Sequence, residues 1–505
     1  MKNYEKLDFG TAGIRGILGP NENQLNENYI YQIANGVAKY LKQNKCLNQS
    51  VVIGRDNRRK SKDFALLFAH IISSYGIKVY YSQEITPTPF LSYLILKLKV
   101  GIGINITASH NPAQYNGVKL YNKNANQMLP DEIKELKAFF EPYKNILNTL
   151  DTYNDISNIE YVEPKLKSEY IQKVIKVGGG FNQGNLRIAY SPQHGTGAYY
   201  ATRILDALVD IKNTYFATKQ MIEDPNFTYS ENPNPESLSA YTELINVARN
   251  NNDIDLLITT DPDSDRVGAM IKHNDEYVLL DGNQTATIIL DYLINFNKGN
   301  LEDTYMVYSY VSSNLPAIIA KKNNVKVFEV PTGFKWIGDL INKNQNLRHL
   351  FSFEESYGSL IDEELARDKD ALQSLVIIIK IAQYYKNKGM TLIDALNSIY
   401  RKYSFVKSKT ISHEMSDMSM IKNFREKFNS LSFPNSTYQK IDYLNDNNPT
   451  DMIKYKFDDN SWISYRPSGT EPKIKFYIFA LDKDEATAQN KLENYQKIIE
   501  VLIKH

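Results

Sequence analysis

Three aspartates stand on alternate residues in the segment Asp261-Pro262-Asp263-Ser264-Asp265-Arg266, directly after the apolar run Leu256–Ile258. Carboxylates at the carboxyl end of a strand can converge on a hard cation such as Mg²⁺, which prefers oxygen ligands. A calcium-binding EF-hand loop is excluded, because Arg266 and Lys272 stand where that loop needs glycine and glutamate. A solvated acidic turn is the alternative, but three like charges this close repel one another without a positive partner. The pattern therefore favours a metal site.

The stretch Ile104–Pro112, with sequence INITASHNP, is an apolar run that ends in a polar turn closed by proline. It predicts a strand followed by an exposed loop that presents the hydroxyl of Ser109. Phosphoryl transfer through an enzyme needs a reachable oxygen nucleophile surrounded by hydrogen-bond donors. Read alone, a Ser-His-Asn-Pro segment is more often only a turn, so its meaning depends on the other motifs.

The stretch Arg466–Lys473, with sequence RPSGTEPK, is dense in groups that bind phosphate. Arginine offers a bidentate fork, and hydroxyls and backbone N–H groups around a glycine can form an anion-binding nest. A capped turn with a surface arginine is the alternative. The number of donors within eight residues favours phosphate.

Two further loops carry polar groups that suit a sugar. Thr332–Lys335 (TGFK) follows the predicted strand Val325–Val330, and Glu354–Gly358 (EESYG) follows the predicted strand Leu350–Phe353. Adjacent carboxylates and a hydroxyl can bind vicinal sugar hydroxyls, and they can equally be exposed loop charges.

Two glycine-rich segments do not indicate nucleotide binding. Phe9–Gly16 lacks the G-x-G-x-x-G spacing and a preceding strand, and Gly195-Thr196-Gly197 lacks the third glycine. Neither is a Rossmann fingerprint or a P-loop.

One strand–helix–strand pattern occurs three times along the chain. Its first strands are Val51–Gly54, Leu186–Ser191 and Tyr305–Tyr310, each followed by an amphipathic segment. Such alternation predicts βαβ units with mostly parallel sheets. The segment after Tyr403 has several short strands and a final helix, Lys483–Lys504. We therefore expect three related α/β domains at residues 1–177, 178–284 and 285–403, and a smaller α+β domain at 404–505.

The composition indicates a globular protein in a reducing compartment. The 505 residues are 42% hydrophobic, and 59 basic residues balance 58 acidic ones, so no global charge favours nucleic acid or an anionic membrane as a partner. The single cysteine, Cys46, excludes an intramolecular disulfide. The first residues do not resemble a signal peptide, and the longest apolar run, Leu375–Ile379, is too short to span a bilayer. We expect a cytoplasmic protein.

Taken together and in this order, the five stretches resemble the α-D-phosphohexomutases, the family of phosphoglucomutase and phosphomannomutase. The resemblance runs from Phe9 to about Tyr477. It implies three related α/β domains with mixed, mostly parallel sheets and a C-terminal α+β domain, arranged around a central active-site cleft.

The resemblance also implies roles for individual residues. Ser109 matches the phosphoserine, whose phosphate oxygen completes a Mg²⁺ site formed by Asp261, Asp263 and Asp265. Residues expected to act on the transferring phosphoryl group or on protons are Arg15, His110, Lys119, Arg266 and Lys369. Residues expected to bind the sugar are Thr332, Gly333, Phe334, Lys335, Glu354 and Ser356. Residues expected to bind the second phosphate are Arg466, Ser468, Gly469, Thr470 and Lys473.

The implied reaction moves a phosphoryl group between two hydroxyls of a hexose phosphate through a 1,6-bisphosphate, with glucose 1,6-bisphosphate as activator. The motifs are more similar to phosphoglucomutases than to phosphoglucosamine mutases, in which a histidine usually stands where this chain has Gly358. We expect glucose phosphates as substrates, with mannose phosphates also accepted, in a monomer or dimer. Phosphomannomutase or phosphopentomutase activity, a non-catalytic sugar-phosphate-binding scaffold and a Mg²⁺-dependent phosphatase stay open as alternatives.

Overall fold

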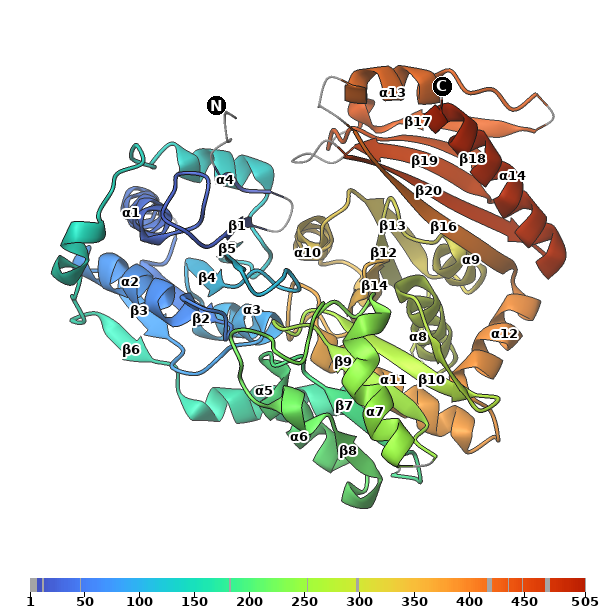
Figure 1. Cartoon of the computed structure of the whole chain (residues 1–505), viewed down its shortest axis with the longest axis horizontal. Helices are drawn as coiled ribbons and strands as arrows, with labels where there is room; N and C mark the ends of the chain where they lie inside the picture. The colour runs from blue at the N-terminus through green and yellow to red at the C-terminus, as the bar shows by residue number, and fades with distance from the viewer. Residues whose placement is uncertain are drawn as a thin grey trace.

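The computed structural model describes residues 7–10, 13–45, 47–180, 183–251, 253–296, 299–415, 420–434, 436–446, 448–467 and 473–504. Its strands form four sheets, coloured in chain order from blue to red in Figure 1. The C-terminal sheet and its helices form a separate lobe at the upper right of that view. None of the helices in the described ranges is long and apolar enough to cross a membrane.

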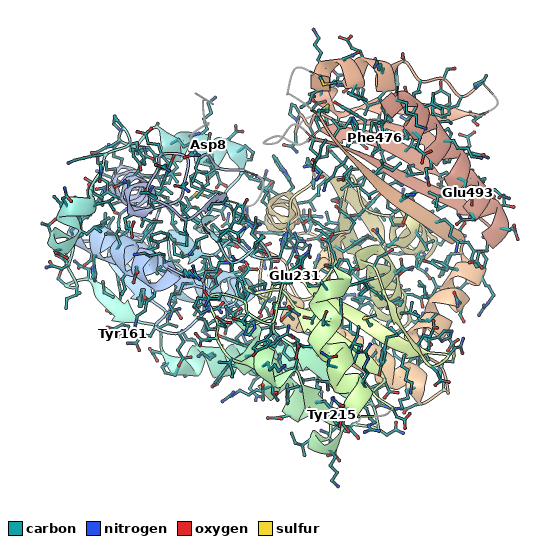
Figure 2. The ribbon with its side chains drawn as sticks, viewed as in Figure 1. Asp8, Tyr161, Tyr215, Glu231, Phe476 and Glu493 are labelled. Atoms are coloured by element: carbon teal, nitrogen blue, oxygen red, sulfur yellow. The ribbon has the colours of Figure 1, made fainter. Side chains whose placement is uncertain are left out.

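The first sheet is mixed, in the order β1-β5-β4-β2-β3-β6. Its strands are β1 (Ile14–Ile17), β2 (Ser50–Arg55), β3 (Lys78–Tyr81), β4 (Ile102–Ile106), β5 (Tyr115–Asn122) and β6 (Ile159–Tyr161). The helices of this unit are α1 (Glu27–Gln43), α2 (Ser61–Ser74), α3 (Thr88–Leu98), α4 (Pro130–Lys137) and α5 (Pro164–Lys176). The central strand β4 is buried along its whole length, as its apolar sequence predicts for a strand with helices on both faces. Tyr161 on the edge strand β6 points outward in Figure 2.

The second sheet has the order β11-β10-β9-β7-β8. Its strands are β7 (Ile188–Ser191), β8 (Thr214–Phe216), β9 (Leu256–Thr260), β10 (Val267–His273) and β11 (Glu276–Leu279). Its helices are α6 (Gly197–Leu208) and α7 (Thr242–Asn250). The pairs β7–β8 and β7–β9 are parallel, whereas β9–β10 is antiparallel, so the loop between β9 and β10 is a tight reversal.

The third sheet has the order β13-β12-β14-β15. Its strands are β12 (Thr304–Ser309), β13 (Lys326–Val330), β14 (Arg348–Glu354) and β15 (Gly358–Leu360). Its helices are α8 (Gly282–Phe296), α9 (Leu315–Lys322), α10 (Phe334–Lys343), α11 (Ala371–Lys386) and α12 (Leu392–Lys402). Helix α11 packs against α5, α6 and α8. One continuous hydrophobic cluster therefore joins the first three units.

The C-terminal sheet, in the order β16-β20-β19-β18-β17, is entirely antiparallel. Its strands are β16 (Phe405–Glu414), β17 (Tyr438–Asp442), β18 (Ile453–Phe457), β19 (Trp462–Pro467) and β20 (Lys473–Asp482). Helices α13 (Met420–Asn429) and α14 (Glu485–Lys504) accompany it, and Phe476 lies within this sheet in Figure 2.

The predicted architecture is confirmed: three related α/β units with mixed sheets precede an α+β unit. The three repeated strand–helix–strand patterns coincide with β2-α2-β3, β7-α6 and β12-α9-β13 to within a few residues. The boundaries between the four domains stay predictions.

Candidate active site

The loop between β9 and β10 gathers the three aspartates. Backbone N–H groups of Asp265 and Arg266 both donate to Asp261 Oδ1, each at 3.0 Å, and this folds the loop back on itself. The three carboxylates are buried, and one oxygen from each lies within 4.8 Å of the others. Asp263 Oδ1 and Asp265 Oδ1 accept no hydrogen bond from the described part of the chain. Buried carboxylate oxygens without partners fit a divalent cation such as Mg²⁺.

Residues from all three α/β units fix this loop. Thr88, at the start of α3, donates its N–H to Asp263 O and its hydroxyl to Asp263 Oδ2, both at 2.8 Å. Thr196 donates its N–H to Pro262 O at 2.8 Å, and Ala371, the first residue of α11, donates to Ser264 O at 3.2 Å. The aspartates therefore lie where the three units meet, although the sequence places them in only one.

Ser109 follows β4 and faces the aspartates. Its hydroxyl donates to Asp261 Oδ2 at 2.8 Å, and its N–H donates to Thr107 Oγ1 at 2.9 Å. Its backbone is left-handed, with φ of 51°, a strained conformation for a residue with a side chain. His110 Nδ1 is 3.3 Å from the Ser109 hydroxyl.

The prediction that Ser109 lies exposed is wrong, because only 1% of the residue is accessible. The segment is a loop, as predicted, but the loop carrying the aspartates packs directly on the hydroxyl. The Ser109 hydroxyl is therefore shielded from bulk water.

Four cationic side chains surround the carboxylates. Lys119, on β5, lies 2.6 Å from Asp263 Oδ2 and 2.9 Å from Asp265 Oδ2. Lys369 Nζ is 3.3 Å from Asp265 Oδ2, and Arg266 Nε is 3.8 Å from Asp265 Oδ1. Arg15, on β1, is the fourth of these side chains and donates to the side chain of Asn111 at 2.7 Å.

These charges move the pKa values in opposite directions. Burial raises the pKa of Asp261 well above its usual value, and the charges of Asp263 and Asp265 raise it further. Burial also opposes the charge on Asp265, but Lys119 and Lys369 outweigh it and hold its pKa below the usual range. Burial lowers the pKa of His110 well below its usual value, with the charge of Arg266 adding to the effect. The histidine ring beside Ser109 is therefore neutral near pH 7.

The two predicted sugar loops lie side by side. Gly333, before α10, donates its N–H to Glu354 Oε1 at 2.7 Å, and Glu354 is the last residue of β14. Burial raises the pKa of Glu354 and lowers that of Lys335. The ammonium of Lys369 lies 5.7 Å from the centre of the Phe334 ring, which connects these loops to the carboxylate cluster.

Two hydroxyl-bearing residues of the predicted sugar loops, Thr332 and Ser356, are less constrained than Gly333 and Glu354. Thr332 Oγ1 is buried without a hydrogen-bond partner in the described ranges. Ser356 is half-buried at the turn after β14. The hydrogen-bonding capacity of Thr332 Oγ1 is therefore left unused by the described residues.

Gly358 explains how Lys369 reaches this place. A Cβ atom at position 358 would lie 1.9 Å from Lys369 Cδ and 2.7 Å from its Cγ. The lysine stem therefore fills the volume that any side chain at 358 would need. Residue 358 and Lys369 compete for one space beside Asp265.

The predicted phosphate loop lies mostly outside the described residues, which omit Ser468, Gly469 and Thr470. Arg466 lies near the end of β19, and Lys473 begins β20. Lys473 Nζ is 3.9 Å from Glu414 Oε1. No contact within the described ranges joins these two residues to the Ser109 cluster.

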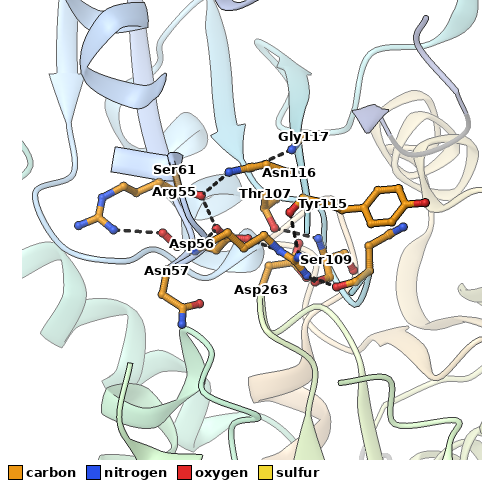
Figure 3. Close-up of polar contacts among 12 residues, drawn as sticks. Arg55, Asp56, Asn57, Ser61, Thr107, Ser109, Tyr115, Asn116, Gly117 and Asp263 are labelled. Carbon is orange, nitrogen blue, oxygen red and sulfur yellow. Dashed lines mark hydrogen bonds and ion pairs between the residues drawn. The ribbon is translucent and has the colours of Figure 1, made fainter. Parts of the chain in front are cut away.

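Sequence reasoning missed two charged groups at this site. Arg58, in the loop after β2, donates to Ser109 O at 2.6 Å, and Glu236 accepts from Arg266 Nη1 at 2.8 Å. A signal for Arg58 was available, since β2 and β4 are parallel neighbours and their following loops must meet at one sheet edge. Figure 3 shows that meeting, with Asp56 and Ser61 beside Thr107 and Ser109.

Comparison with known proteins places this site in a family. Residues 6–146, 168–274 and 281–403 match models of the phosphoglucomutase/phosphomannomutase alpha/beta/alpha domains I, II and III. The chain is 34% identical to a phosphoglucomutase of Staphylococcus aureus, across 94% of this chain and 89% of that protein.

Solved structures agree on the fold. The chain is similar to parafusin, a phosphoglucomutase from Paramecium, with a TM-score of 0.75 at 17% identity over 99% of this chain and 96% of that one. It is also similar to a phosphoglucomutase/phosphomannomutase family protein of Burkholderia thailandensis, with a TM-score of 0.73 at 15% identity over 97% of both chains. The chain belongs to the phosphoglucomutase/phosphomannomutase family, the α-D-phosphohexomutases, and is therefore a phosphohexomutase, an isomerase that acts by intramolecular phosphotransfer.

Proposed function

We propose that this protein interconverts glucose 1-phosphate and glucose 6-phosphate through a phosphorylated Ser109 and a glucose 1,6-bisphosphate intermediate. The observation that carries the proposal is the 2.8 Å contact between the Ser109 hydroxyl and Asp261, inside a cluster of three buried aspartates. An oxygen nucleophile beside a cation site is what phosphoryl transfer through an enzyme requires.

The aspartates Asp261, Asp263 and Asp265 would hold Mg²⁺. The donor set is made of carboxylate oxygens, which suits a hard divalent cation. When bound, the ion supplies positive charge that offsets the charge of the phosphoryl oxygens.

The surrounding cations have separate tasks in this proposal. Arg15 and Arg266 bind the equatorial oxygens of the transferring phosphoryl group, and Lys119 keeps Asp263 and Asp265 ionised and oriented. Burial disfavours the charge of Lys369, but the charges of Asp265 and Asp368 outweigh burial and raise the pKa of Lys369, so it is an ammonium at rest. It takes up the proton of the attacking sugar hydroxyl as its own proton passes to the oxygen that leaves phosphorus. The neutral ring of His110 places Nδ1 3.3 Å from the oxygen of unphosphorylated Ser109, whose own proton goes to Asp261, so the ring acts there as a donor.

The remaining predicted residues would orient the sugar phosphate. Glu354 and Ser356 bind two adjacent sugar hydroxyls, and the Thr332–Lys335 loop fixes the ring against Phe334. The Arg466–Lys473 stretch binds the phosphate that is not transferred, so that the bisphosphate can turn and present its other end to Ser109. With one phosphate held at Ser109 and the other at the Arg466–Lys473 stretch, the same serine can give its phosphoryl group to one sugar hydroxyl and later take the phosphoryl group from the other.

The choice of glucose is supported by the chain itself and by its relatives. The Staphylococcus aureus relatives are named phosphoglucomutase, and Lys369 here fills the space that a histidine at position 358 would take in the glucosamine branch. Mannose phosphate is proposed as a second substrate, because glucose and mannose differ only in the orientation of the hydroxyl at C2. A site that binds other hydroxyls of the sugar discriminates only weakly between two orientations of this one.

A coupled mutase assay tests the proposal. Glucose 1-phosphate, Mg²⁺ and a trace of glucose 1,6-bisphosphate should give rapid glucose 6-phosphate formation that is abolished in Ser109→Ala. A parallel assay with mannose 1-phosphate sets the preference, and a phosphate-release assay separates a mutase from a phosphatase. Turnover that persists in Ser109→Ala, or release of phosphate at the rate of isomer formation, would refute the proposed mechanism.

A further inference from the structure

Arg58 is buried against the loop that carries Ser109. Its guanidinium donates to four backbone carbonyls of that loop: to Ser109 at 2.6 Å, Asn111 at 2.5 Å, Pro112 at 2.8 Å and Tyr115 at 3.0 Å. Each terminal nitrogen serves two carbonyls, which is a geometry that only the planar, forked guanidinium provides. One side chain thus ties together both ends of the loop.

The arginine is itself held firmly. Its Nε lies 3.1 Å from Asp56 Oδ2, and both side chains are fully buried. Asp56 Oδ1 accepts the N–H of Arg58 at 2.9 Å and the hydroxyl of Ser61 at 2.6 Å. On its other side the guanidinium lies 4.8 Å from the centre of the Phe227 ring, which belongs to the second unit.

The backbone of the loop explains why such an anchor is needed. Ser109 has a φ of 51°, and a strained residue keeps that conformation only when its surroundings over-determine it. The bond from Arg58 to Ser109 O fixes the peptide that follows the serine, while Thr107 holds the N–H before it. Together these two contacts direct the hydroxyl toward Asp261.

We infer that Arg58, oriented by Asp56, is a positioning residue that holds Ser109 at the angle required for phosphoryl transfer. The inference rests on the proposed role of Ser109. The guanidinium of Arg58 donates to backbone carbonyls of the protein and has no part in the proposed binding of the sugar. Removing the guanidinium should therefore slow phosphoryl transfer to the serine without weakening sugar binding.

Arg58→Lys tests this, with Arg55→Lys as the matched control. Lysine keeps the positive charge, but its single ammonium cannot serve four carbonyls. Arg55 stands on the same segment and donates to Asp56 O and Gln83 O, both at 3.1 Å, and these bonds do not involve the serine loop. The single-turnover rate of Ser109 phosphorylation by glucose 1,6-bisphosphate, followed by intact mass, should fall roughly 10- to 100-fold in Arg58→Lys. It should stay at the wild-type rate in Arg55→Lys.

Two further readouts separate positioning from a general loss of structure. The KM for glucose 1-phosphate should be unchanged in Arg58→Lys, and amide hydrogen exchange should quicken in residues 107–116 while the rest of the first unit keeps its protection. Asp56→Asn, which leaves the arginine in place but removes its charged partner, should slow the same step to a smaller extent. A wild-type phosphorylation rate in Arg58→Lys, or equal slowing in Arg55→Lys, overturns the inference.

Failure of the proposed function would look different. A wild-type protein that takes up no phosphoryl group from the bisphosphate refutes the role of Ser109. In that case unchanged exchange of residues 107–116 in Arg58→Lys would separately refute the anchoring by Arg58.

Discussion

Adding one methyl group at Gly358 should displace Lys369 and slow catalysis while leaving every proposed catalytic residue in the chain. The new Cβ would lie 1.9 Å from Lys369 Cδ, whereas ordinary contacts begin at 3.4 Å, so the lysine stem must move by at least about 1.5 Å. If that shift carries the ammonium away from Asp265, their separation grows from 3.3 Å to about 4.8 Å, beyond the range of an ion pair.

The size of the effect follows from the two consequences of that shift. Overpacking a buried site costs about 1–3 kcal/mol of unfolding free energy. Misplacing a proton-transfer group by about 1 Å lowers kcat by about 100-fold. We therefore expect Gly358→Ala to lose about 100-fold in kcat in the glucose 1-phosphate assay, with a modest fall in stability measured by urea unfolding.

A double-mutant cycle with Lys369→Ala identifies the cause. The three atoms nearest to the new methyl group all belong to the lysine stem, so once that stem is gone Gly358→Ala should add little to the loss in the Lys369→Ala background. Gly180→Ala is the control, because a Cβ there meets nothing within 4 Å. Wild-type kcat in Gly358→Ala, or an equal loss from the methyl group with and without Lys369, would refute the reasoning.

Three other outcomes are expected. Asp263→Ala, which leaves Lys119 with one carboxylate fewer, should abolish Mg²⁺-dependent turnover and weaken Mg²⁺ binding measured by calorimetry; unchanged binding would remove Asp263 from the metal site. Arg466→Ala should lower kcat/KM roughly 10- to 100-fold by the loss of a charged phosphate contact, and an unchanged kcat/KM would contradict that role. Burial lowers the pKa of Lys454 to about 8 despite Glu329, so the unfolded chain binds more protons above that pH, and stability should rise between pH 8 and the usual lysine pKa. Urea unfolding across that window should show a steeper rise in wild type than in Lys454→Met, in which Lys380, whose pKa burial also lowers to about 8, still titrates, and equal slopes would disprove the assignment.

The parts of the fold that the sequence predicts well are those set by local pattern. The predicted strands Val51–Gly54 and Tyr305–Tyr310 lie within a residue or so of β2 and β12. Their β-branched and aromatic residues make the strand period plain. The motif loops follow strands, and the carboxyl ends of neighbouring strands meet at one edge. The meeting of Ser109 with the aspartates follows from that rule once the units are packed.

The features that could not be predicted depend on contacts between distant segments. The burial of Ser109 comes from a loop more than a hundred residues away, at Asp261, and no local pattern encodes that packing. The competition between Gly358 and Lys369 is equally non-local, because the sequence shows only a glycine and a lysine on separate turns. Only the folded structure shows that these two residues lie close enough to compete for the same space.

Arg58 can be predicted from the sequence only in part. Its position after the strand β2 can be predicted, and so can the parallel pairing of β2 with β4 that brings the two following loops together. What the sequence does not carry is the left-handed φ of Ser109, which turns the carbonyls of that loop toward the arginine. Because a residue held in a strained conformation needs a rigid anchor, the strain at Ser109 and the burial of Arg58 have one explanation. Relaxing the anchor should therefore change the geometry of the serine before it changes the stability of the fold.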